Sequence, residues 1–178
     1  MKNQYDKLPS LSFVEAVKSV LSNLINFRGR SRRSELWWYF LLYFVVYMIL
    51  SRFLKEPTIL NSVILYALNL TLAAVTVRRL HDRGQSGLWV LASYVIGLCC
   101  AVYIYSSRML EITKQVNYNP EELVATMMNP IFIVLCVLSL IVNITIFVFA
   151  ILDGKPEENK YGYSPKYAEV DDDDEDCQ

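Results

Sequence analysis

The segment of this chain with the most chemistry runs from Arg78 to Gly87 and reads Arg-Arg-Leu-His-Asp-Arg-Gly-Gln-Ser-Gly. It holds the single histidine, His81, and three arginines within six positions. A carboxylate can orient an imidazole for acid–base chemistry, and Asp82 is the next residue. Adjacent helix residues point about 100° apart, however, so a direct His81–Asp82 pair requires a turn. Gly84 and Gly87 favour such a turn.

Three roles stay open for this segment, and catalysis is the least favoured. Ser86 has no nucleophile elbow or triad partner, and no second histidine or cysteine lies nearby in sequence. No catalytic residue, metal or cofactor is therefore predicted. The structural alternative is a hydrogen-bonded corner in which arginines end a helix at its negative pole and Asp82 pairs with an arginine.

The third role is recognition of an anion, since arginine forks suit phosphate groups and glycines let backbone amides approach a ligand. A cationic ring at headgroup depth would bind an anionic lipid or an acidic segment of a partner. The chain's own acidic run, Asp171–Asp176, is one such segment. The candidate site residues are Arg30, Arg33, Arg78, Arg79, His81, Asp82 and Arg83.

Four long charge-free windows set the fold class. Hydrophobic residues make up 54% of the 178 positions, and charged residues make up 20%. A membrane-spanning helix needs about 20 predominantly apolar residues. The windows predict spans at about 37–54, 59–77, 88–105 and 131–152. We expect an all-α integral membrane four-helix bundle.

An amphipathic helix is predicted before the first span. Ser12 followed by Glu15 forms a capping-box pattern, and apolar residues then recur at helical spacing. This helix is too polar to cross a bilayer, so we expect it to be interfacial, with its apolar face towards the lipid. Ser31 or Ser34 is predicted to cap the first span. Residues 1–9 are expected to be flexible, 10–165 to form the membrane domain, and 166–178 to be an acidic disordered tail.

Two asparagines lie at similar depth within the spans. Asn69 and Asn143 are nine and ten residues before Arg78 and Asp153, respectively. We expect them to face the bundle interior and to make interhelical polar contacts. No span holds a charge near its middle, which argues against ion or proton coupling.

The distribution of lysine and arginine predicts the orientation. Thirteen of the 17 lie before the first span, between the second and third spans, or in the tail, and four lie on the other side. Positive residues favour the cytoplasm. Both termini and the Arg78–Gly87 segment are therefore predicted to be cytoplasmic, and the 106–129 loop external.

Three motif segments carry a resemblance to a known family. They are Phe27-x-Gly-Arg-Ser-x-Arg-x-Glu-x-Trp37, then Arg78-Arg-Leu-His-Asp-x-Gly-x-Ser-Gly-x-Trp89, and Asn159-x-Tyr-Gly-x-x-Pro165. The combination resembles a bacterial inner-membrane family known as domain of unknown function 805. The resemblance implies a four-span inner-membrane protein and no particular activity. Leu88 departs from the aromatic residue that the family often has there, and the 106–129 loop is longer than usual.

These observations favour a binding or scaffolding protein whose arginine-rich cytoplasmic face recognises anionic lipid headgroups or an acidic partner segment. The alternative is a small-molecule transporter or channel, and a membrane-embedded enzyme ranks last. Expected partners are anionic membrane lipids, with a protein partner or a second copy of the chain also open. No nucleic-acid partner is expected.

Overall fold

The structure is a computed structural model that describes residues 5–54, 59–107, 109, 112 and 120–169. The helices in this part of the chain are α1 (Phe13–Leu21), α2 (Arg33–Phe53), α3 (Ile59–Asp82), α4 (Leu88–Ser106), α6 (Pro120–Met127) and α7 (Pro130–Ile151). Two short strands, β1 (Tyr5–Lys7) and β2 (Tyr167–Glu169), complete it. The predicted all-α class is confirmed. Helices α2, α3, α4 and α7 contain segments long and apolar enough to cross a membrane.

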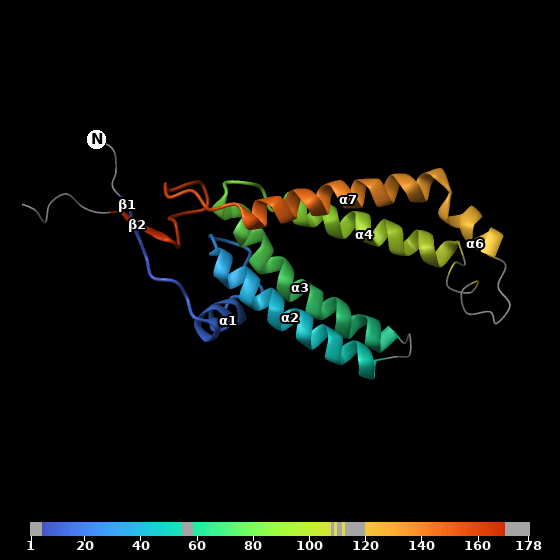
Figure 1. The fold of residues 1–178 in the computed structure, drawn as a ribbon, viewed down its shortest axis with the longest axis horizontal. Coiled ribbons are helices and arrows are strands. Elements are labelled where there is room, and N and C mark those ends of the chain that lie inside the picture. Colours follow the sequence, from blue (N-terminus) through green and yellow to red (C-terminus); the bar gives the residue numbers. More distant parts are fainter. Residues whose placement is uncertain (1–4, 55–58, 108, 110–111, 113–119, 170–178) are drawn as a thin grey trace, which may run out of the picture. The chain divides into compact units, whose positions relative to one another are not determined.

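The chain forms two compact units. The first contains residues 1–87 and 149–178, and the second contains residues 88–148. In the first unit, α2 and α3 lie side by side, and α1 packs against α2 (Figure 1). The core of this unit is formed by Val20, Leu36, Tyr39, Val75 and Ala150.

Hydrogen bonds join α2 to α3 within the apolar segment. The Tyr39 hydroxyl donates to Thr71 Oγ1 at 2.7 Å, and the Tyr43 hydroxyl donates to Asn69 Oδ1 at 2.8 Å. The Asn69 amide also donates to the Leu65 carbonyl one turn earlier at 2.8 Å. Asn69 therefore has partners both on α2 and on its own helix.

Replacing Tyr43 with phenylalanine should weaken the α2–α3 pair by about 0.6 kcal/mol, the average for an interhelical hydrogen bond in a membrane. The measurement is the apparent free energy of unfolding in detergent. Tyr47→Phe is the matched control, because the Tyr47 ring stacks on Tyr43 while no hydrogen bond from its hydroxyl occurs in the described part of the chain. Equal effects of the two substitutions would contradict the prediction.

Within the second unit, contacts at two levels join α4 and α7. The Ser93 hydroxyl donates to Asn143 Oδ1 at 3.1 Å, and the Asn143 amide donates to the Ser139 carbonyl at 2.8 Å. Further along, the Tyr103 and Phe132 rings stack with their centroids 5.0 Å apart. The Tyr103 hydroxyl donates to the Thr126 carbonyl of α6 at 3.0 Å.

Helix α1 begins as its sequence predicts. Glu15 N–H donates to the Ser12 hydroxyl, and Ser12 N–H donates to the Glu15 carboxylate at 2.9 Å. The hydrogen bond from the Ser12 backbone lowers the pKa of Glu15. Ala16 and Val20 are fully buried on the side of the helix that packs into the unit.

The two ends of the chain differ from the sequence expectation. Residues Tyr5–Lys7, expected to be flexible, pair antiparallel with Tyr167–Glu169, expected to be part of a disordered tail. The physical reason is a tertiary contact, because Arg32 donates to the Pro9 carbonyl at 2.6 Å and to the Pro165 carbonyl at 2.5 Å. One guanidinium thus brings the two segments together. Residues 1–4 and 170–178, which include the acidic run, lie outside the described residues.

The second predicted span also extends further than expected. Helix α3 continues past Val77 to Asp82, so Arg78, Arg79, His81 and Asp82 are all helical. The turn comes only afterwards, at Gly84, whose φ of 76° is readily adopted by glycine. The turn that a direct His81–Asp82 pair would require is therefore absent at these two residues, whose side chains leave the helix about 100° apart.

Candidate functional site

Asp82 is the centre of a buried charge cluster. Its Oδ1 accepts from Arg30 Nε at 2.9 Å and lies 2.8 Å from Arg30 Nη2, and its Oδ2 is bound by Arg79 Nη1. The Arg30 and Arg79 side chains are each 1% exposed. We call Arg30, Arg79 and Asp82 the Asp82 cluster. Buried charges are tolerated when they are paired and hydrogen-bonded, as these are.

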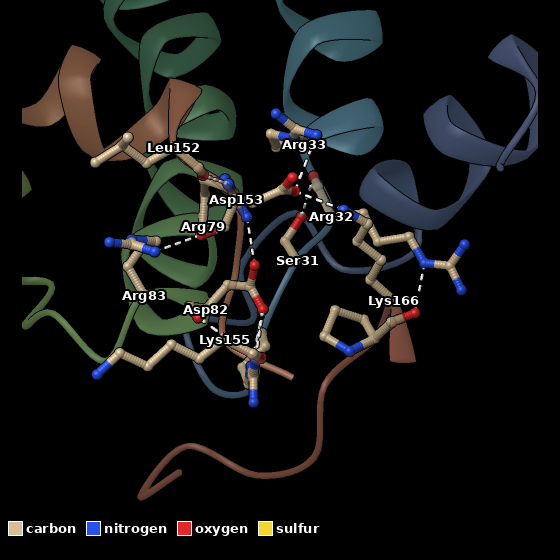
Figure 2. Close-up of polar contacts among 12 residues, drawn as sticks. Ser31, Arg32, Arg33, Arg79, Asp82, Arg83, Leu152, Asp153, Lys155 and Lys166 are labelled. Atoms are coloured by element: carbon tan, nitrogen blue, oxygen red, sulfur yellow. Dashed lines mark hydrogen bonds and ion pairs between the residues drawn. The ribbon is translucent and has the colours of Figure 1, made fainter. Parts of the chain in front are cut away.

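Arg79 joins the cluster to the end of α7 (Figure 2). Its Nε donates to the Ala150 carbonyl at 3.2 Å, and its Nη2 donates to the Leu152 carbonyl. The last carbonyls of a helix have no partner within the helix and lie at its negative pole. Arg79 therefore caps α7 while its charge is balanced by Asp82.

Arg30 holds the segment that follows α7. Its guanidinium donates to the Glu157 carbonyl at 2.8 Å, to the Gly162 carbonyl at 3.2 Å and to the Lys155 carbonyl. The Asp82 backbone takes part as well, because Lys155 N–H donates to the Asp82 carbonyl at 3.2 Å. Residues from all three motif segments thus converge on one cluster.

Gly154 lies directly against Asp82. A Cβ atom added to Gly154 would be 1.8 Å from Asp82 Oδ2 and 2.5 Å from Asp82 Cγ. No real side chain can occupy that position without displacing the carboxylate. No sequence motif singled out this residue. Its only signal is a glycine two positions after the fourth predicted span, which is also typical of an ordinary turn.

His81 belongs to a separate contact on the same helix. Its ring stacks on Tyr161 with centroids 3.7 Å apart and planes 6° apart. Nδ1 lies 3.1 Å from the Gly29 carbonyl, which can only accept, so Nδ1 carries a proton. The Asn159 amide donates to the His81 carbonyl at 3.0 Å. Asp82 binds arginines and His81 binds a carbonyl, so the two do not form an acid–base pair.

The outer arginines gather around Asp153 (Figure 2). Arg33 lies 2.9 Å from Asp153 Oδ1, and Arg83 donates to the Asp153 carbonyl at 2.5 Å. Lys166 donates to the same Oδ1 at 2.6 Å. Burial acts to raise the pKa of Asp153, but the Lys166 hydrogen bond and the Arg33 charge outweigh it and lower that pKa.

Arg78 is also buried. Its residue is 6% exposed, and within the described part of the chain its Nε has no hydrogen-bond partner. The same holds for Arg83 Nε, although Arg83 Nη1 donates to the Asp153 carbonyl. No carboxylate among the described residues lies within 4.0 Å of the Arg78 guanidinium, although its charge interacts with that of Glu35. Its carbonyl accepts from Ser31 N–H at 3.2 Å.

Glu35 already has its own hydrogen-bond donors. Its carboxylate accepts from the Ser19 hydroxyl at 2.5 Å, from the Ser31 hydroxyl at 2.7 Å and from Arg32 N–H at 2.8 Å. This corrects the expected serine cap of the first span. Ser31 donates to Glu35, and the Glu35 side chain satisfies the backbone N–H at the start of α2.

The structure thus divides the predicted site residues into four groups. Arg30, Arg79 and Asp82 form the buried cluster, and Arg33 and Arg83 meet Asp153. His81 stacks on Tyr161, and Arg78 Nε has no hydrogen-bond partner among the residues that the structure describes. Among the described residues, no group of three or more histidine, cysteine, aspartate or glutamate side chains could hold a metal ion.

A family model described as a protein of unknown function (DUF805) matches residues 24–163, which include the first two motif segments and residues 159–163 of the third. The chain belongs to this family. Two similar proteins are named inner membrane protein YhaI, one from Escherichia coli strain K12 and one from E. coli O157:H7. Each is 37% identical over 81 residues, covering 43% of this chain and 69% of the relative. No solved structure matches the chain.

Family membership and the four apolar helices agree. This DUF805 member is related to an inner-membrane protein and has four helices able to span a membrane. The match covers the region in which the Asp82 cluster is assembled. Both arginines of this cluster bind carbonyls and a carboxylate of the chain itself. This is the hydrogen-bonded corner that the sequence offered as the structural alternative.

Proposed function

We propose that this DUF805 protein is an inner-membrane binding protein that receives an anionic group at Arg78, on a cytoplasmic face held rigid by the Asp82 cluster. The observation that carries the proposal is the buried Arg78 Nε without a hydrogen-bond partner among the described residues. The other candidate arginines donate to carbonyls or carboxylates of the chain itself.

Burying the Arg78 Nε without a hydrogen-bond partner costs free energy. An unpaired buried polar group costs about 1–3 kcal/mol, and a charged group costs more. Arg78 is buried to nearly the same extent as Arg79, but no carboxylate of the described residues lies within 4.0 Å of it, whereas Asp82 lies within that distance of Arg79. A phosphate oxygen would supply both the hydrogen-bond acceptor and the negative charge.

The position of Arg78 favours a lipid phosphate as the source of that anion. Arg78 lies near the end of α3, directly after its apolar segment, where lipid headgroups meet a spanning helix. The positive-inside rule predicts that this end of α3 lies on the cytoplasmic side, where the leaflet is anionic. An acidic partner segment is the competing source and is an outcome of the test below.

Arg78→Gln should abolish retention of an anionic phospholipid while the protein stays folded. Loss of hydrogen bonds to a charged group corresponds to about 1.5–3 kcal/mol, or roughly a ten-fold or greater loss of affinity. Native mass spectrometry of full-length protein in mild detergent, titrated with phosphatidylglycerol, measures this. Arg52→Gln, an exposed arginine near the end of α2, is the charge-matched control.

Arg79→Gln tests whether the structural and binding roles are separate. This variant should be destabilised because Asp82 loses a partner and α7 loses its cap. If Arg78→Gln retains phosphatidylglycerol as wild type does, the proposal is wrong. If a co-purifying acidic peptide, and not lipid, disappears from Arg78→Gln, the anion comes from a protein.

A further inference from the structure

Helix α1 has two apolar sectors, and only one of them packs into the protein. Ala16 and Val20 are fully buried against the first unit. Phe13, Val14 and Leu21 are 41%, 70% and 50% exposed, respectively. At about 100° per residue, Val14 and Leu21 lie roughly 140–160° from Ala16, and Phe13 lies at the edge of this exposed face, about 60° from Ala16. An exposed apolar face of this kind marks a binding or membrane surface.

The exposed sector forms an open groove of about 520 Å³. Small-molecule sites usually have about 300–1,000 Å³ and are mostly apolar, with a few polar groups that fix orientation. Lys18 supplies the single charge of this groove. It is exposed and makes no ion pair in the described part of the chain. The lining residues are Phe13, Val14, Val17, Lys18, Leu21 and Ser22.

The groove is continuous with the surface of a spanning helix. Phe13 contacts Trp38 of α2 edge to face, with ring centroids 5.5 Å apart. Trp38 is half-exposed in the first turns of α2, and tryptophan there is typical of the membrane–water interface. The apolar surface therefore passes from α1 to the first turns of α2, which is long and apolar enough to span a membrane.

We infer that this groove binds an anionic glycerophospholipid, with an acyl chain along Phe13, Val17 and Leu21 and its phosphate on Lys18. Lysine can lay its aliphatic stem on apolar surface and extend its ammonium to a charged group. Lipid is favoured over a protein segment because the groove adjoins α2, a helix long and apolar enough to span a membrane. The site uses no residue of the Arg78 site, so the two proposals can fail separately.

The test uses the full-length protein in phosphatidylcholine vesicles that contain a minority of phosphatidylglycerol. Two photoactivatable lipids, identical in acyl chain and differing only in these headgroups, are cross-linked, and labelled peptides are mapped by mass spectrometry. The phosphatidylglycerol-to-phosphatidylcholine labelling ratio of residues 13–22 is compared with that of residues 40–48 in α2. A lysine at an anionic surface predicts an excess of about five-fold for the groove.

Lys18→Gln should return the ratio for residues 13–22 to the α2 value. Lys7→Gln, a matched change of an exposed lysine on β1, should leave the ratio unchanged. Leu21→Asn should reduce labelling of the groove by both lipids. The inference is overturned if residues 13–22 take up neither lipid while α2 does, which would show the face covered by protein. It is also overturned if Lys18→Gln leaves the excess intact.

Discussion

Asp82→Asn is expected to lower the free energy of unfolding by about 3–5 kcal/mol, the cost of breaking a buried ion pair by removing one partner. Asp82 is the carboxylate that pairs with both Arg30 and Arg79, and the side chains of these two arginines are each 1% exposed. Asparagine has nearly the same shape, so the effect would come from charge and hydrogen bonding. Arg79 would be left buried at the end of α7 with carbonyls alone.

The measurement is denaturant or thermal unfolding of the purified protein in a mild detergent. Asp153→Asn is the matched control, because Asp153 also pairs with an arginine but its side chain is 49% exposed. Exposed ion pairs contribute about 0–1 kcal/mol. If the two variants were equally stable, the Asp82 cluster would not be the electrostatic centre of this unit.

Gly154→Ala should destabilise the same unit through steric overlap. The new methyl group would fall 1.8 Å from Asp82 Oδ2. The carboxylate cannot simply move aside, because Arg30 and Arg79 hold both of its oxygens. Overpacking of this kind usually costs about 1–3 kcal/mol and occasionally more. The expected result is a lower unfolding midpoint despite the usual gain of backbone order from alanine.

Gly97→Ala supplies the control for Gly154→Ala. A Cβ atom on Gly97 would have no heavy atom within 4 Å among those that the structure describes, and Gly97 lies within α4. Alanine there should be neutral or stabilise the helix by up to about 1 kcal/mol. A neutral Gly154→Ala variant would mean that the segment after α7 can move away from Asp82 at little cost.

Together these variants separate two roles of the arginine-rich segments. Arg30 and Arg79 act inside the fold, where they join the end of α7 to α3 and to the 155–162 segment. Arg78 has a buried Nε without a hydrogen-bond partner among the described residues and no carboxylate of that part of the chain within 4.0 Å, which leaves room for a function beyond the fold. Loss of stability is therefore expected from the first two, and loss of binding from the third.

The helices and their starts could be predicted from the sequence because they depend on local signals. Charge-free segments long enough to cross a bilayer predicted the four apolar helices, because membrane helices must satisfy their backbone hydrogen bonds internally. The Ser12–Glu15 capping box gave the first turn of α1, because both partners lie within four residues. The arginine, histidine and aspartate residues of the central segment were recognisable by type.

Only the tertiary structure decided what those residues contact. Arg30 and Asp82 are 52 positions apart, and Arg79 reaches carbonyls more than 70 positions away, so no local pattern specified these pairs. The strand pair β1–β2 likewise joins segments more than 150 positions apart, and Arg32 donates to the carbonyls of both Pro9 and Pro165 beside it. Gly154 and Arg78 were indistinguishable in sequence from an ordinary turn glycine and an ordinary helix-end arginine. Gly154 gets its role from its contact with Asp82, and Arg78 gets its role from burial. The contact and the burial arise only when the three motif segments fold together.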